Sequence, residues 1–362
     1  MPDTLVTSRT AQALPAVYSA VAVISEAVAS LPVKLYKQSE NGLQEATESR
    51  VSQLLQKPNH YQSSFEFVEY LTRSALLSGN GYAWIRESEL EPLNPQQVAV
   101  EELQVPVEGV RFRYKVTDNF GRMHTLLPRE LLHLRAPSDD GIIGQSPISL
   151  CRQAIGLGLD QQSHGANTFK NGAKPSGVLE FEKFLNDDKA KKIKDSWGEQ
   201  YQGIDNIGKT VVLEGGMTFK PLQITNNDAE WLESREFTVK EIARMYRMPA
   251  YFLGDLSGNT YSNVNEARRA FLTQCLMPWL NRWTGAITRD LLDDTSLMVQ
   301  HDTREYLRGD VRERYESYQI GLQAGFLSVD EVRESENLPP ISLDERENPP
   351  RHQPKTQQKE PA

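Results

Sequence analysis

Little in this sequence meets the needs of a secreted or membrane-spanning protein. The two cysteines, Cys151 and Cys275, both fall among apolar residues of predicted helices, so we expect free thiols in a reducing compartment rather than a disulfide or a metal site. The chain opens without a basic segment followed by an apolar one, which predicts no secretory signal. The most apolar stretch, residues 14–35, contains Glu26 and Pro32 and is too polar for a membrane span. We therefore expect synthesis in the cytoplasm and no membrane partner.

An excess of positive charge is also missing. The chain of 362 residues carries 40 Lys and Arg against 49 Asp and Glu, a formal net charge of -9. Proteins that grip nucleic acid concentrate Lys and Arg in order to displace counterions. The composition therefore argues against tight nucleic-acid binding, but it is compatible with a protein that handles DNA without holding it.

Sequence patterns of catalysis and nucleotide binding are absent as well. The six histidines are scattered singly, outside any metal-ligand spacing, and no GxxxxGK[ST] or GxSxG motif occurs. Gly156-Leu157-Gly158 lies inside a predicted helix and lacks the third glycine of a dinucleotide fingerprint. We therefore expect no catalytic site and no cofactor.

Acidic and histidine pairs are the remaining candidates for metal chemistry. His301-Asp302 is similar to the pair used by some phosphohydrolases, but two adjacent residues without further ligands favour an ordinary solvated strand end. The aspartate pairs fall in a predicted turn, at a helix start and near a helix end, where acids are common: Asp139-Asp140, Asp187-Asp188 and Asp293-Asp294. The sequence therefore predicts no metal site.

The strongest positive pattern is a pair of helices joined by a polar loop, between Asn226 and Leu292. The first helix follows the capping residues Asn226-Asn227-Asp228 and is expected to end before Pro249. The second is predicted to begin at Asn263 and to kink at Pro278, because its apolar period continues beyond the proline. The loop contains many turn-forming residues: Ser257, Gly258, Asn259, Thr260, Tyr261 and Ser262.

The first 145 residues combine helical and strand patterns and predict an α+β domain. Residues 1–13 are polar and are expected to be loose, and helices are predicted over 17–31 and 64–77. Strands are predicted at 33–36, 82–85, 97–100, 110–116, 123–127 and 131–134, with a hairpin turn at Asp118-Asn119-Phe120-Gly121. A further strand is predicted much later, at 298–300.

A predicted helix, which ends at Asn171-Gly172, and then a small insert follow this domain. Ser146-Pro147 is an N-cap followed by proline, and Gly156, Gly158 and Gly165 suggest close approach to another backbone, such as a neighbouring subunit. Residues 174–224 are predicted to form a small α/β insert with a mixed-charge helix and strands at 177–181, 210–213 and 218–224. That helix carries a short basic run, for which an exposed helix face is favoured over a DNA-binding patch: Lys189, Lys191, Lys192 and Lys194.

The carboxyl-terminal part begins with helical patterns and ends in a polar tail. Helices are predicted over 310–322 and 328–335, and Leu338-Pro339-Pro340 is expected to stop them. Residues 341–362 are rich in Pro, Glu, Lys and Gln and contain little to bury, so we expect disorder there.

Taken together, these segments resemble phage portal proteins of the HK97-like family from about residue 16 to 340. The order and spacing of several short segments carry the resemblance: residues 16–21, 29–36, 79–83, 144–148, 169–179, 212–217, 241–244, 253–255 and 278–280. The resemblance implies a dodecameric ring at one capsid vertex, through which double-stranded DNA is packaged and ejected. It also implies docking of terminase, a head–tail connector, and the major capsid or scaffold protein, in a virion assembled in the host cytoplasm.

The resemblance further assigns a role to each part of the chain. Residues 1–145 and 263–303, the latter a long kinked helix with its return strand, correspond to the wing. Residues 146–172 and 226–249 correspond to the two stem helices, 173–225 to the clip, and 304–340 to a short helical crown, followed by the tail at 341–362. Residues 250–262 correspond to the tunnel loop, which places Ser257 to Ser262 in the DNA channel. The four clip lysines would then face the terminase.

Two other functions remain open at this stage. One is a head–tail adaptor that stacks on a portal ring, although adaptors are usually much shorter chains. The other is a metal-dependent phosphohydrolase that uses His301 and Asp302, whose signature would be an activity lost in His301→Ala. A structural, non-enzymatic portal subunit is the leading interpretation.

Overall fold

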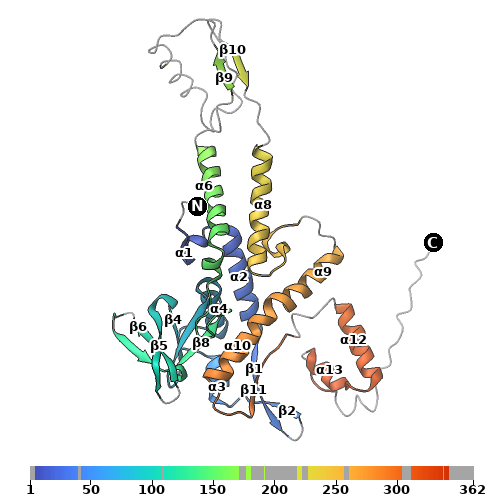
Figure 1. Ribbon diagram of the computed structural model, residues 1–362. Coiled ribbons are helices and arrows are strands. Elements are labelled where there is room, and N and C mark those ends of the chain that lie inside the picture. The colour runs from blue at the N-terminus through green and yellow to red at the C-terminus, as the bar shows by residue number, and fades with distance from the viewer. Residues whose placement is uncertain are drawn as a thin grey trace, which may run out of the picture. The chain divides into compact units, whose positions relative to one another are not determined.

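The computed structural model describes residues 5–39, 42–107, 110–118, 120–170, 177–180, 191, 218–221, 227–256, 261–303, 311–336 and 338–341. The chain forms two compact units, residues 1–302 and 303–362, and each is described by itself (Figure 1). Strand pairing is antiparallel throughout the described part, and helices and strands are segregated rather than alternating. This arrangement confirms the predicted α+β class.

Helices α2 (Pro15–Ala29) and α4 (Ser64–Ser78) pack together at the apolar centre of the first unit. The predicted stripe on α2 is buried as expected from its helical spacing. α4 begins with a capping box between Ser63 and Glu66 and ends at Gly79, which has a φ of +85°. A side chain at Gly79 would collide with the backbone of Gly144, so this position requires glycine on two grounds. A short helix, α3 (Arg50–Gln56), packs against the first strand.

The expectation that residues 1–13 are loose is wrong for part of the segment. Ser8–Ala11 form a short helix, α1, which starts with a capping box between Thr7 and Thr10. Ala11 is fully buried, and the Ser8 hydroxyl donates to the Leu77 carbonyl at 3.3 Å. This docking cannot be predicted from apolar spacing, because a single buried alanine produces no apolar period.

The first unit also contains three antiparallel sheets of three strands each. In each sheet a middle strand is flanked by two others. The middle strands are β1 (Val33–Ser39), β3 (Asn80–Ile85) and β6 (Val110–Thr117). Their flanking strands are β2 (Gly42–Glu45) and β11 (Leu297–His301), β4 (Leu90–Leu93) and β8 (Leu131–Arg135), and β5 (Val98–Val107) and β7 (Met123–Leu126). Two 3₁₀ turns, η1 (Pro95–Gln97) and η2 (Pro128–Glu130), precede β5 and β8.

The predicted strands in this region are confirmed, including the distant one that pairs with β1 as β11. The predicted hairpin turn is confirmed too: the Asp118 carboxylate accepts hydrogen bonds from the N–H groups of Phe120 and Arg122, and Gly121 has a φ of +79°. β2 and β4 were not predicted. β2 is exposed along its whole length and β4 contains Pro92, so neither shows the alternation of a half-buried strand.

A buried hydrogen-bond network joins two of these sheets, those with β3 and β6 as their middle strands. The Gly144 N–H donates to Asn80 Oδ1 at 2.8 Å, so that oxygen is an acceptor and His133 Nε2 donates its proton to it at 2.9 Å. His133 Nδ1 then accepts from Arg135 Nε at 3.1 Å and lies 2.9 Å from the Tyr114 hydroxyl. Burial, and then the nearby Arg135 and Arg289 charges, hold the pKa of His133 well below its usual value. His133 is therefore a neutral core residue with a fixed tautomer.

The same histidine docks the long kinked helix onto β8. Its backbone N–H donates to the Asp290 carboxylate at 2.9 Å, and its carbonyl accepts from Arg289 at 2.7 Å. Both partners lie at the end of α10 (Met277–Asp290), and Trp283 on this helix donates to Thr72 of α4 at 2.9 Å. α10 is thus held to β8 at its end and to α4 in its middle.

The long helix has three segments: α9 (Tyr261–Ala270), the π-helical turn η5 (Phe271–Leu276) and α10. The predicted interruption near Pro278 is confirmed in the form of this π turn, which ends just before the proline. The apolar residues that repeat every four positions along this helix are largely buried, with only the last of them half-buried: Phe271, Cys275, Trp279, Trp283, Ile287 and Leu291. The helix begins two residues earlier than the predicted Asn263.

The second unit contains two short helices, α12 (Val311–Ala324) and α13 (Val329–Ser335), as predicted. A capping box between Ser328 and Glu331 starts α13, and the Arg314 guanidinium pairs with the Glu336 carboxylate at 2.8 Å. Leu327 closes against Gly321, where a larger residue would collide. None of the described apolar side chains in this unit is buried. The predicted disordered tail begins at residue 341, where the Ile341 N–H donates to the Asp330 carboxylate at 3.0 Å, and residues 342–362 lie outside the described residues.

Candidate functional site

Two long helices, α6 (Arg152–Lys170) and α8 (Asn227–Met245), run side by side and carry the segments that the sequence singled out (Figure 1). A short helix, α5 (Pro147–Leu150), precedes α6 and begins at the predicted cap, where the Ser146 hydroxyl accepts from the Ser149 N–H. Gln161 bridges α6 to α8, because its side-chain amide donates to Ser234 and its oxygen accepts from Thr238 at 3.0 Å. Polar side chains thus fix the register of the pair.

Small residues let these helices approach each other. A side chain at Gly158 would meet the Thr238 methyl group at 2.9 Å and a Leu14 methyl group at 3.0 Å. The predicted close approach at this glycine therefore exists, but the neighbours are side chains of the same chain rather than another backbone. Ile155, Leu159 and Ile242 are buried nearby and complete the apolar contact.

α8 ends earlier than predicted, and by a different mechanism. Arg247 adopts a left-handed conformation with a φ of 56°, the one positive φ among the non-glycine residues that the structure describes. The Met248 N–H donates to the Ala243 carbonyl at 2.9 Å and the Arg247 N–H donates to the Arg244 carbonyl at 3.1 Å, a Schellman motif. Burial of Met248 stabilises this turn. Pro249 follows the stop rather than causing it.

The connection between α8 and α9 begins with a 3₁₀ turn, η4 (Ala250–Leu253), and Gly254 at a φ of +86°. Lys240 of α8 lies 3.5 Å from the Asp255 carboxylate, so the start of the connection is tied back to the helix. Residues 257–260 lie outside the described part. Tyr261 and Ser262, which were predicted to belong to the loop, lie in the first turn of α9. Asn263 is therefore inside the helix and does not begin it.

The insert between α6 and α8 contains one described strand pair. β9 (Gly177–Glu180) and β10 (Thr218–Pro221) are antiparallel, in agreement with two of the predicted strands. Lys191 is helical and exposed. The other three lysines of the predicted basic run, Lys189, Lys192 and Lys194, and the strand predicted at 210–213 lie outside the described residues. The structure therefore places one of the four clip lysines on an exposed helix.

The two cysteines differ in their surroundings, although both are free thiols as predicted. Cys275 is buried and its thiol lies 3.3 Å from the Tyr246 carbonyl oxygen. Cys151 lies at the junction of α5 and α6 and is half-buried. The predicted burial is therefore correct for Cys275 and only partly correct for Cys151.

An exposed apolar face on α5, α6 and α8 did not emerge from the sequence. Leu150, Leu157 and Phe237 are 66%, 56% and 56% exposed. All three lie outside the apolar stripes that are buried within the chain. Apolar residues at such positions were the feature of the sequence that could have indicated an exposed apolar face. A groove of about 740 Å³ runs between α6 and Glu241 of α8 and is lined by Leu150, Cys151 and Leu157.

The histidine and aspartate candidates do not assemble into a metal site. His301 ends β11 opposite Val33, and burial lowers its pKa to about 4, so it is not the solvated residue that the sequence predicted. Within the described ranges, no three His, Cys, Asp or Glu side chains could jointly hold a metal ion. Asp140 caps its own turn by accepting from the N–H groups of Ile142 and Ile143. Among the described helices, none is long and apolar enough to cross a membrane.

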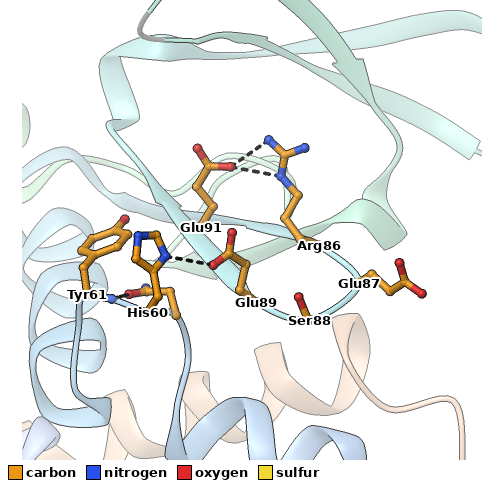
Figure 2. Close-up of a pocket in the computed structure, with 8 residues that line it drawn as sticks. His60, Tyr61, Arg86, Glu87, Ser88, Glu89 and Glu91 are labelled. Atoms are coloured by element: carbon orange, nitrogen blue, oxygen red, sulfur yellow. Dashed lines mark hydrogen bonds and ion pairs between the residues drawn. The ribbon is translucent and has the colours of Figure 1, made fainter.

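A second hollow, of about 460 Å³, lies between the α3–α4 connection and the β3–β4 turn (Figure 2). Figure 2 shows two of its side-chain contacts: Arg86 with Glu91 at 2.8 Å, and His60 with Glu89 at 3.4 Å. Such exposed pairs contribute little to stability.

The fold therefore defines a structural subunit. It consists of three small sheets, a helical centre and a pair of long helices, α6 and α8, with the insert between them in the chain. Comparison with known proteins gives the family. Residues 15–337 match the family described as phage portal protein. The chain belongs to the phage portal protein family, which is structural rather than enzymatic.

Individual relatives agree with this assignment. The chain is 30% identical over 358 residues to the probable portal protein of Streptomyces phage phiC31, covering 93% of this chain and 77% of that one. It is 27% identical over 338 residues to the portal protein of Enterobacteria phage HK97, covering 90% and 78%. A chain in the solved neck of a native gene transfer agent particle, computed with C12 symmetry, is similar with a TM-score of 0.62 at 27% identity, covering 92% of each chain.

Proposed function

We propose that this chain is the subunit of a dodecameric portal ring at one vertex of a phage head. The observation that carries the proposal is the family match over residues 15–337, because it spans the sheets, the α6–α8 pair and the long kinked helix together. The C12 symmetry of the gene transfer agent neck supports twelve copies. Identical copies related by rotation close into a ring through heterologous contacts.

Double-stranded DNA passes through this ring during packaging and ejection. The loop that ends at α9 faces the channel, with Ser257, Gly258, Asn259 and Thr260 as its central part and Tyr261 and Ser262 in the first helical turn. A net charge of -9 and the absence of charged side chains from residues 256–262 support this role. Each phosphate that a conduit neutralised would add to the attraction that translocation must overcome.

The insert at 173–225 docks the terminase during packaging and the head–tail connector afterwards. Its basic run, Lys189, Lys191, Lys192 and Lys194, faces the terminase, and the exposure of Lys191 supports that assignment. The sheets of residues 1–145 meet the major capsid or scaffold protein. The ring assembles in the host cytoplasm and remains in the virion.

Neither alternative function gains support. The length of the family match, which covers most of a full portal chain, does not favour a short head–tail adaptor. His301 lies in a sheet, and the described residues contain no group of three side chains that could hold a metal ion. These observations do not favour a phosphohydrolase.

Mass photometry of the purified protein, with negative-stain images, tests the ring. We expect a particle of roughly twelve subunit masses with an open axial channel, as closed rotational symmetry requires. A monomer or dimer at every concentration, with or without scaffold protein, would contradict the proposal.

Deletion of Gly258–Thr260 tests the channel loop. We expect rings of unchanged mass but a several-fold fall in nuclease-protected DNA, because α8 and α9 remain intact while the segment that faces the DNA is gone. Replacement of the same three residues by Gly-Ser-Ser is the matched control, since it keeps the loop length. Loss of ring assembly in both variants would show that the loop is structural.

A further inference from the structure

The exposed apolar face of the two long helices lies where the fold of a single chain does not need it. We call it the outer face and define it as Leu150, Ala154, Leu157, Phe237 and Glu241. Leu157 follows Ala154 by one helical turn on α6, and Glu241 follows Phe237 by four residues on α8, so each pair shares one side of its helix. The opposite sides carry the residues that join α6 to α8.

The outer face is shaped as well as apolar. Its groove of about 740 Å³ lies along α5 and α6 with Glu241 on the far rim. The residues that line the groove include one acid, Glu241, and one base, Arg152, so their formal charges cancel. A surface of this kind suits a protein partner and offers nothing to a nucleic-acid backbone, which binds through clustered positive charge.

We infer that a second copy of this chain covers the outer face, and that Cys151 lies inside the interface between neighbouring copies. This inference rests on the proposed ring. A ring places an identical neighbour beside every subunit, and the C12 symmetry of the similar neck structure supports a neighbour of that kind. Apolar side chains more than half exposed on a long helix pair are what such a neighbour would bury.

Cys151 makes the inference measurable because it is the one half-buried thiol of the pair. It lines the groove beside Leu150, whereas Cys275 is buried under Tyr246 in the same unit. Burial and the nearby Glu241 charge raise the pKa of the Cys151 thiol. It therefore reacts slowly with maleimide near neutral pH, and we would label at a pH of about 8.5, close to the unperturbed thiol pKa.

The first experiment compares maleimide labelling of Cys151 in separated subunits and in assembled rings. We expect the rate to fall by about tenfold or more on assembly, as a neighbour excludes the reagent. Cys275 should stay slow in both states and reports that the chain remains folded. Equal Cys151 rates in rings and in separated subunits would overturn the inference while leaving the ring itself established.

A pair of variants gives an independent test. Leu157→Asp places a charge on the outer face, and we expect a folded subunit that no longer forms rings. Phe120→Asp is the control, because Phe120 is 87% exposed in the β6–β7 turn, outside the proposed interface. Rings from Leu157→Asp as stable as those from Phe120→Asp would overturn the inference. Failure of the unmodified chain to form rings would instead overturn the proposed function and the inference with it.

Discussion

At the scale of single residues, the buried histidines are the most condition-sensitive feature of the first unit. His133 is neutral, with both ring nitrogens engaged, and His301 has its pKa lowered to about 4 by burial. The unfolded chain would take up protons at both histidines near pH 6.5, while the folded chain would resist. Between that pH and the lowered folded-state values, the unfolded state binds more protons, so stability falls as the pH falls.

We therefore expect the free energy of unfolding to drop between pH 7 and pH 5. For His301, whose pKa burial lowers to about 4, the loss should be about 2 kcal/mol at pH 5, from a displacement of about 1.5 units below pH 6.5, and His133 adds a loss of the same sign. Urea unfolding followed by tryptophan fluorescence at both pH values measures it. In His133→Gln, the remaining pH dependence should be smaller. An unchanged pH dependence in that variant would show that the titration lies elsewhere.

The residue scale also shows what patterns can and cannot reveal about the candidate site. Capping residues such as Ser146 and Ser328 were readable, because a cap and its partner lie within four residues of each other. The left-handed Arg247 was not, since an arginine reaches that conformation only when surrounding contacts, here those of buried Met248, compensate for its cost.

At the scale of elements, most helices and strands could be predicted because their apolar residues repeat with the period of the structure they form. Exposed strand β2 could not, because it pairs with β1 without burying any side chain and so shows no apolar period. Short helix α1 could not, because the Leu77 carbonyl that its Ser8 contacts is distant in sequence. The π turn η5 is an intermediate case. Pro278 signalled a disturbance, but whether it took the form of a kink, a stop or a π turn depends on packing around Cys275 and Trp279.

The second unit supports a prediction at this scale. Helices α12 and α13 bury none of their described apolar side chains, whereas α4 buries seven residues. Short helices without tertiary burial open readily. In separated subunits we expect the amide hydrogens of Val311–Ala324 to exchange about 100-fold faster than those of α4, by mass spectrometry.

Assembly supplies the comparison for that measurement. If the apolar side chains of the second unit become covered in the ring, the exchange of α12 should slow there while that of α4 stays unchanged. Protection of α12 equal to that of α4 in separated subunits would contradict the prediction, because it would require burial that the unit does not show.

At the scale of the whole molecule, the subunit is polar and acidic but keeps several large apolar side chains at its surface. Scattered apolar residues are ordinary, but those on α6 and α8 gather on one face of a helix pair whose inner face is already complete. Apolar periodicity predicted the buried inner face and missed the exposed outer one. The reason is that periodicity identifies the residues that pack inside one chain, and it does not identify residues that become buried only between copies.

The pairing of β1 with β11 has a consequence for how the chain is made. Val33 lies opposite His301, so the middle strand of one sheet leaves the ribosome long before its partner is translated. At roughly 5–20 residues per second, the interval is on the order of 15 to 50 s. During that time one edge of β1 has free backbone hydrogen-bonding groups, and strand edges of this kind invite pairing with other nascent chains. The first unit can therefore finish folding only after its last strand has been synthesised. The time that translation takes thus sets when a subunit becomes available for assembly.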